Sequence, residues 1–343
     1  MTLGLSKRSS NILRKPAGKM QKKELSFFFL SGKRRGDRIF RILTIGAAAY
    51  TLLMLALILY AVGDGSQKIF SFEGFKFLIN TDWNSVEGRE SFGALPYIIG
   101  TLISSGIAMA IGVPISLGIA IFLSEMASPR IGTPLSFVVE LLAAVPSIVY
   151  GLWALFVFRF WILNLIETPL YNAFGNSIPF FSAAPFGLDI FTAGIVLAIM
   201  IIPIVSSICR EVMRAVPDTQ REAAYSLGAT RWETVRIAIF PYAKSGILGA
   251  SMLGLGRAVG ETMLVTLVIG NAIGATAIPT SLFSPSQTLS SLIANEFNEA
   301  SSDLHLSALI GLGAVLLIIT MAINIGARLL VSRMVKVSPG VKE

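Results

Sequence analysis

Charged residues, cysteine and histidine are scarce in this sequence of 343 residues. Only 14% of the residues are charged, whereas 54% are hydrophobic, and the mean hydropathy is +0.72. An ordinary water-soluble domain of this size is far less apolar, so soluble globular and disordered proteins are excluded. The single cysteine, Cys209, excludes a disulfide framework, and the single histidine, His305, excludes histidine-rich metal chemistry. We therefore expect no metal and no cofactor.

Basic residues outnumber acidic ones by 28 to 20, and the excess is concentrated near the N-terminus. Residues 1–41 contain 12 Lys or Arg and two acidic residues, directly before a long apolar stretch. This pattern is typical of a cytoplasmic anchor under the positive-inside rule. Because the rule already accounts for the net charge, nucleic acid is not an expected partner.

Apolar blocks of membrane length predict an all-α, polytopic protein that spans the lipid bilayer six times. A seventh span within 160–188 is the alternative, but three prolines and three asparagines there argue against a continuous helix. We predict a re-entrant or interfacial loop for this stretch. The six predicted spans are 39–62, 94–122, 132–158, 190–209, 245–270 and 305–331.

The charges between the spans predict the orientation of the chain. Segment 210–244 has six basic and four acidic residues, whereas 63–93 has three basic and five acidic ones and 272–304 has three acidic ones and no Lys or Arg. Six spans with both termini in the cytoplasm place 210–244 inside, and a seventh would reverse this. The expected parts are a basic cytoplasmic tail (1–38), the membrane domain (39–331) and a cytoplasmic C-terminal tail (332–343).

The chain is not expected to be an enzyme. Its stretches outside the membrane are too short for a catalytic domain, and the phosphate-binding pattern G-x-x-x-x-G-K-[ST] does not occur. An intramembrane enzyme would need a nucleophile and base, or paired intramembrane aspartates, and the sequence has neither pattern. Any nucleotide hydrolysis therefore belongs to a partner, and an ATP-independent carrier is the rival interpretation.

The predicted cytoplasmic segment contains two helix-start signals in quick succession. Thr219 with Glu222, and Thr230 with Glu233, have the spacing of a capping box, so two short helices are predicted. Gly228 falls where the first helix should end and can adopt the left-handed conformation that turns the chain.

One face of the first short helix is small and mildly apolar. Ala223, Ala224 and Leu227 share this face, which suits insertion into a groove on another protein. The alternative from the residues alone is an ordinary cytoplasmic loop that rests against the bilayer.

These residues resemble a known motif. Glu222, Ala223 and Ala224, with Gly228 and the later Pro241, are similar to the EAA motif of binding-protein-dependent ABC importer permeases. The motif expects Ile and Leu where this chain has Ala238 and Phe240. The resemblance implies that the segment is a coupling helix, which docks on an ATP-binding subunit.

Three further stretches narrow the resemblance to phosphate-specific permeases, and to their C-type subunit more than the A-type. They are 140–151, 252–262 and 294–297. The resemblance implies a type I, MetI-like bundle in a prokaryotic inner membrane, with inorganic phosphate as the substrate. It also implies an A-type second permease, two ATP-binding subunits and an extracytoplasmic phosphate-binding protein. A permease for another oxyanion, such as sulfate or molybdate, is the alternative.

Charged residues inside the predicted spans are candidates for the substrate pathway. Arg257 is expected near the middle of the bilayer, with Glu261 one helical turn further along, and an anion pathway needs such a cation. A guanidinium group also matches phosphate oxygens in planar, paired hydrogen bonds. The alternative is a structural ion pair between the two. Glu140 is either a second partner of Arg257 or a protonated core residue.

Glycines surround Arg257 in the sequence. Gly254, Gly256 and Gly260 remove side-chain bulk, so a partner helix or the substrate can approach the backbone closely. The alternative is tight packing within one subunit. We expect Gly256 and Gly260 to be the exception that faces another subunit.

Overall fold

The computed structural model describes residues 35–334, so residues 1–34 of the predicted N-terminal tail (1–38) and residues 335–343 of the predicted C-terminal tail (332–343) lie outside the described residues. The chain divides into two units, Met1–Tyr60 and Ala61–Glu343. The described part of the first unit belongs to α2 (Arg35–Gly65), and its apolar side chains, such as Leu43 and Leu52, are exposed. This exposure is expected for a helix that faces lipid.

The described chain contains six helices that are long and apolar enough to span a membrane, so the predicted number is confirmed. The six candidate spans are Ile39–Gly65, Leu95–Met126, Ser147–Phe174, Ile190–Arg214, Arg231–Gly260 and Asp303–Leu329.

Several spans consist of consecutive α-helices joined by single π-helical turns, which are wider than an α-helical turn. After α2, the α-helices are α3 (Gln67–Phe72), α4 (Lys76–Ile79), α5 (Leu95–Ile121), α6 (Pro129–Ala143), α7 (Ser147–Trp153), α8 (Arg159–Ile162), α9 (Thr168–Phe174), α10 (Ile190–Arg214), α11 (Asp218–Ser226), α12 (Arg231–Thr234), α13 (Phe240–Gly260), α14 (Met263–Val268), α15 (Leu289–Glu296) and α16 (Asp303–Met334). The π-helical turns are η1 (Phe122–Met126), η2 (Ala154–Phe158), η3 (Leu163–Glu167) and η5 (Val235–Ile239). The 3-10 turns are η4 (Pro179–Phe181), η6 (Gly274–Ala277) and η7 (Phe297–Glu299), and β1 (Trp83–Asn84) pairs antiparallel with β2 (Ser91–Phe92).

The third span lies later in the chain than predicted. The predicted helix 132–158 is broken before Pro146, because a residue that precedes proline disfavours helical backbone, and α6 is therefore a separate helix. The loop predicted at 160–188 is wrong for its first half, which is helical up to Phe174. Pro169 lies in the first turn of α9, where its missing N–H is tolerated, and the Asn164 amide donates to the Phe160 carbonyl (2.8 Å).

The fifth span is also displaced from its predicted range of 245–270. Its helix begins at Arg231, passes Pro241 directly after the wider turn η5, and ends at Gly260. Glu261 is extended (φ −70°, ψ 129°), and its carbonyl accepts a hydrogen bond from the Ser290 hydroxyl (2.8 Å). The Ser290 hydroxyl thus supplies the Glu261 carbonyl with the hydrogen bond that a continuing helix would supply from its own backbone. The helix ends there, and α14 starts as a new helix at Met263.

The core of the bundle is centred on α10. This helix is the most buried of the six candidate spans, and α5 packs closely along it. A Cβ atom added at Gly112 of α5 would lie 2.9 Å from Ile201, and one at Gly194 of α10 would lie 2.5 Å from Ile107. Each helix therefore uses a glycine to admit a large side chain of the other.

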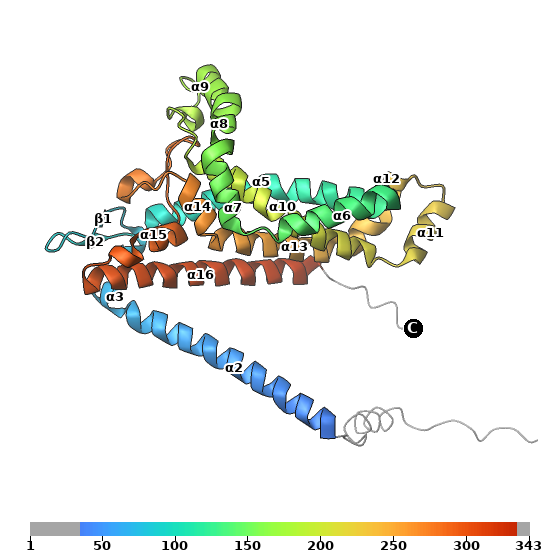
Figure 1. Cartoon of the computed structure of the whole chain (residues 1–343), viewed down its shortest axis with the longest axis horizontal. Helices are drawn as coiled ribbons and strands as arrows, with labels where there is room; N and C mark the ends of the chain where they lie inside the picture. The colour runs from blue at the N-terminus through green and yellow to red at the C-terminus, as the bar shows by residue number, and fades with distance from the viewer. Residues whose placement is uncertain (1–34, 335–343) are drawn as a thin grey trace, which may run out of the picture. The chain divides into compact units, whose positions relative to one another are not determined.

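A second core lies where α3, the β hairpin, α15 and the start of α16 meet. Here Glu296 Oε2 accepts a hydrogen bond from Trp83 Nε1 (2.8 Å) and lies 2.9 Å from His305 Nε2. Figure 1 shows this group at the end of the bundle opposite α11 and α12. The segments 63–93 and 272–304 therefore share one end, as the charge pattern predicts, and 210–244 lies at the other.

Two buried carboxyl groups fasten α10 to the preceding span. Asp189 accepts a hydrogen bond from the Thr192 backbone N–H (2.8 Å), while Glu167 accepts from the Thr192 hydroxyl (2.9 Å) and the Gly187 N–H (3.1 Å). Burial, followed by the charge of Glu167, raises the pKa of Asp189 from 3.8 to about 8. The Asp189 carboxyl group is therefore protonated at neutral pH.

This pair predicts a specific dependence of stability on pH. Because the folded-state pKa of Asp189 is raised, its contribution is complete below pH 3.8 and is lost as the pH rises through about 8. Asp189→Asn keeps an acceptor for Thr192 and has no proton to lose. We expect the melting temperature of the wild type, minus that of Asp189→Asn in the same detergent, to fall between pH 4 and pH 8 and to level off above pH 8. A difference that does not change with pH would contradict the raised pKa of Asp189.

Candidate functional site

Arg257 projects from an exposed face of α13. No hydrogen bond or ion pair joins its guanidinium group to another residue in the part of the chain that the structure describes. The predicted depth assumed a helix that begins at Ser245, whereas the observed helix ends three residues after Arg257. Arg257 therefore lies near the C-terminal end of α13, three residues before the helix breaks.

The three glycines near Arg257 divide between two roles. A Cβ atom at Gly254 would lie 2.6 Å from Val205, so this glycine packs against α10. Gly256 and Gly260 have nothing within 4 Å of such an atom. Together with the half-exposed Leu253, they lie on the same exposed part of α13 as Arg257. Because they have no side chain, a neighbouring molecule can approach the helix backbone there.

Glu261 is close to Arg257 in sequence, but the two do not form the predicted helical pair. The helix ends between them, and no ion pair joins them in the described structure. The Glu261 carboxylate lies 3.5 Å from the backbone N–H of Leu264, which leaves most of its acceptor capacity unused. A structural ion pair therefore does not explain these two charges.

Glu140 has a partner that the sequence analysis missed. Its Oε1 accepts a hydrogen bond from Arg210 Nη2 (2.7 Å), and the same nitrogen donates to Glu211 (2.9 Å). Glu140 thus pairs with Arg210 and not with Arg257. The Arg210 side chain is only 5% exposed, and its Nε and Nη1 atoms have no partner. Because position 210 falls within the predicted cytoplasmic segment 210–244, a buried cation is not expected there from the sequence alone.

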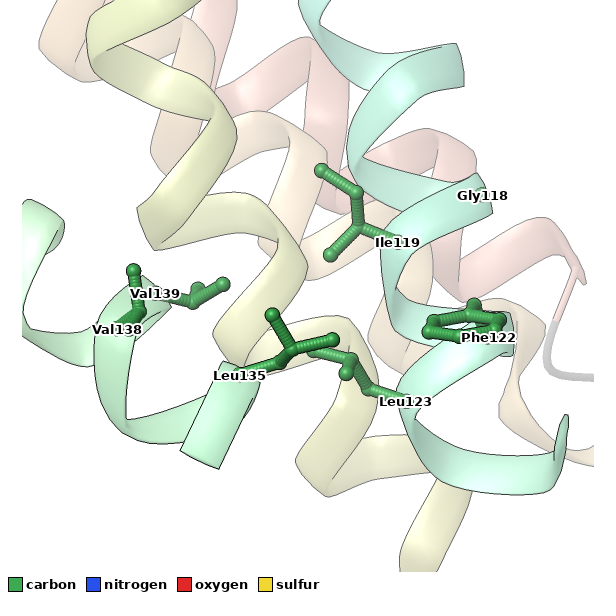
Figure 2. A pocket seen from close by; sticks show the side chains of 7 residues that line it. All are labelled: Gly118, Ile119, Phe122, Leu123, Leu135, Val138 and Val139. Carbon is green, nitrogen blue, oxygen red and sulfur yellow. The ribbon is translucent and has the colours of Figure 1, made fainter. Parts of the chain in front are cut away.

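Two apolar hollows in the described part of the chain offer few groups that could bind an anion. A groove of about 370 Å³ between α5 and α6 is lined by apolar residues alone, which Figure 2 shows. They are Gly118, Ile119, Phe122, Leu123, Leu135, Val138 and Val139. A second hollow, of about 320 Å³, includes Tyr150, whose hydroxyl donates to the Leu142 carbonyl (2.9 Å).

The segment between α10 and α13 has the predicted two helices, α11 and α12. Gly228 has a φ of +82°, and the N–H groups of Gly228 and Ala229 bond the carbonyls of Tyr225 and Ala224 at the end of α11. Thr230 and Glu233 form the predicted capping box. Thr219 and Glu222 do not, because α11 begins directly after Pro217 with no side-chain cap.

The predicted docking face of α11 is narrower than expected. Ala224 is buried against the rest of the chain, whereas Ala223, Glu222 and Leu227 are exposed, Leu227 by 86%. Pro241 is also exposed, at the start of α13. An exposed leucine beside an exposed alanine is available to a partner, whereas Ala224 is buried within its own chain, where α11 packs against η5.

The fold is that of an ABC importer permease. It matches the crystal structure of a bacterial ABC transporter involved in the import of the acidic polysaccharide alginate over 85% of this chain and 98% of that chain, with a TM-score of 0.53. The sequence identity is 17%, so this likeness concerns the fold alone.

The chain belongs to the family of binding-protein-dependent transport system inner membrane components, which its residues 112–336 match. It is therefore a transporter subunit and not an enzyme, and it works with further permease and ATP-hydrolysing subunits.

Several relatives bear the name phosphate transport system permease protein PstC. The protein from Pasteurella multocida is 48% identical, covering 88% of this chain and 93% of its own length. Those from Haemophilus influenzae and Mesorhizobium japonicum are 47% and 44% identical, each over 87% of this chain and at least 90% of their own length.

The turn after α11 yields a prediction. Gly228→Val places a β-branched residue at φ +82°, whereas Gly228→Asn tolerates this conformation. We expect both variants to insert into membranes, but transport with Gly228→Val should fall by about tenfold or more, because a strain of roughly 1–3 kcal/mol reorients α11. Transport assays of both variants, with the amount in the membrane as the control, test this. Wild-type transport with Gly228→Val would show that the orientation of α11 is not needed.

Proposed function

We propose that this chain is the C-type permease subunit of an ATP-driven importer of inorganic phosphate in a prokaryotic cytoplasmic membrane. It pairs with a homologous A-type permease, two ATP-binding subunits bind the segment around α11, and an extracytoplasmic phosphate-binding protein delivers the substrate. The relatives named above support phosphate as the substrate.

The unpartnered Arg257 carries the proposal. A guanidinium group that faces lipid costs several kcal/mol, so the exposed face of α13 is covered by something polar or wet. A second permease subunit across a water-lined pathway supplies such a cover. Gly256 and Gly260 leave no side chain between that pathway and the helix backbone, so an anion can reach Arg257.

Glu261 supplies the selectivity that Arg257 alone lacks. Sulfate and phosphate present similar oxygens to a guanidinium group, but phosphate near neutral pH retains a proton that it can donate to a carboxylate. Fully ionised sulfate has no such proton and is repelled. The Ser290 hydroxyl holds the Glu261 backbone in its extended conformation, which fixes the carboxylate beside the end of α13.

Glu140 contributes to the pathway closer to the coupling end of the bundle. Its side chain is 53% exposed, and it neutralises the buried Arg210. When ATP closes the ATP-binding subunits, they move α11 and α12, and the bundle changes between inward-facing and outward-facing states. Both termini lie in the cytoplasm in this arrangement.

The substrate assignment is tested with two variants of the complete complex in liposomes. Arg257→Gln should lower phosphate uptake by about a hundredfold, because it removes a charge-assisted, paired contact. Glu261→Gln should instead make phosphate uptake sensitive to sulfate, because an amide can donate to sulfate whereas a carboxylate cannot. Copurification of the ATP-binding subunits confirms assembly.

Near-normal phosphate uptake by assembled Arg257→Gln would contradict the pathway assignment. Uptake of sulfate or molybdate in preference to phosphate by the wild type would favour the alternative oxyanion importer.

The orientation is tested by thiol labelling in a Cys209→Ala background. Asn298 and Thr219 are both exposed and lie in the segments at opposite ends of the bundle. A cysteine at position 298 should react with a membrane-impermeant reagent added to intact cells, and one at position 219 should react only after lysis. The opposite result would reverse the proposed topology.

A further inference from the structure

The side chain of Arg221 joins three segments at the coupling end of the bundle. Arg221 lies in α11, and its guanidinium group forms a paired contact with Glu125, in the π-helical turn η1 that ends the span of α5. The two distances are 3.3 Å from Nε to Oε2 and 3.1 Å from Nη2 to Oε1. Glu125 is 96 residues away in sequence, and both side chains are largely buried, with exposures of 16% and 8%.

The remaining donors of Arg221 reach the end of α10 and the start of α11. Nη2 donates to the Met213 carbonyl (2.9 Å), and Nη1 donates to the Val216 carbonyl and to Asp218 (3.1 Å). Arginine has five N–H donors, and all five have an acceptor here. Met213 lies in the last turn of α10, where its carbonyl also accepts from the Val216 N–H (3.2 Å), and Val216 follows the helix, where a carbonyl has no further helical donor. Arg221 therefore completes the end of α10 and holds α11 against it.

No other side chain of α11 does this in the described structure. Asp218 bonds only Arg221, and the Ser226 hydroxyl donates to the Ala223 carbonyl within the same helix. All hydrogen bonds from α11 side chains to another helix thus come from Arg221. The joint is also packed, because Met213 and Val216 are buried and the Ser124 hydroxyl lies 3.6 Å from the Met213 sulfur.

We propose that Arg221 is a positioning residue that transmits the movement of α11 to α5 and α10 as one rigid unit. This inference rests on the proposed function, in which an ATP-binding subunit moves α11. The backbone already links the segment to α13, because α12, η5 and α13 form one continuous helical rod that carries Arg257. On the opposite side, the helical backbone is interrupted at Ala215–Pro217, between α10 and α11. The contact between Arg221 and Glu125 fastens α11 to α5 and α10 across this interruption, so that α11 moves with them as it does with α13.

The test compares hydrolysis with transport in the complete complex, reconstituted with its ATP-binding subunits and phosphate-binding protein. Arg221→Gln and Glu125→Gln each break the paired contact and leave the exposed Ala223 and Leu227 unchanged. We expect the ATP-binding subunits to remain bound and ATP hydrolysis to continue. Phosphate uptake per ATP hydrolysed should fall by about three- to thirtyfold, the usual range for residues that couple two sites.

Two further variants make the result specific. Arg214→Gln removes an exposed arginine of the same region that has no hydrogen bond in the described structure, and the ratio of uptake to hydrolysis should not change. The double variant Arg221→Glu with Glu125→Arg restores a pair of opposite charges. It should recover a large part of the lost ratio, because the interaction and not either residue alone is needed.

Two results would overturn the inference. One is a wild-type ratio of uptake to hydrolysis in assembled Arg221→Gln. The other is loss of the ATP-binding subunits in both single variants without recovery in the double variant, which would make the contact purely architectural. A wild-type complex that hydrolyses ATP without taking up phosphate would instead contradict the proposed function, whatever the Arg221 variants do.

Discussion

The close packing of α5 against α10 is the contact on which the rest of the bundle depends. In a membrane, helix association gains little from the hydrophobic effect and relies on backbones that approach closely. Gly112 and Gly194 allow this approach from opposite sides, and α13 packs on the same central helix through Gly254. At the coupling end, the helices of this core are held to α11 by hydrogen bonds from one arginine. Loss of that packing would therefore misplace both the proposed pathway face and the proposed coupling segment.

Three arginines of the described structure illustrate how the environment assigns different roles to one side chain. Arg210 is buried and paired with glutamates, which stabilises the contact between α6 and α10. Arg221 is buried with all five donors satisfied, which is typical of a rigid joint. Arg257 is exposed and unpaired, which is costly in a membrane unless water or an anion reaches it. The proposed translocation pathway thus rests on an arginine with no hydrogen-bond partner in the described structure. The proposed mechanical link rests on an arginine whose five donors are all hydrogen-bonded.

The sequence predicted more of the coupling segment than of the pathway. Short-range signals, the positive φ of Gly228 and the capping box of Thr230 with Glu233, are confirmed because they depend only on neighbouring residues. The box at Thr219 is wrong, since Pro217 already starts that helix. The prediction that Arg257 and Glu261 share one helix is wrong, because α13 ends at Gly260. At that point the hydroxyl of Ser290, which is distant in sequence, donates to the Glu261 carbonyl. The partner of Glu140 lies 70 residues away, where no local pattern could indicate it.

By itself, the sequence determined the number of membrane spans, the charge difference between the two ends and the family. These properties follow from hydropathy, net charge and local motifs, which are additive along the chain. Only the tertiary structure decided where the third and fifth spans begin and end, which glycines face outward, and which acidic residue neutralises each buried arginine. Each of these depends on which donors and acceptors meet across the bundle. In a membrane, a polar group takes whatever partner the packed helices bring to it, and that choice is not encoded in any one segment.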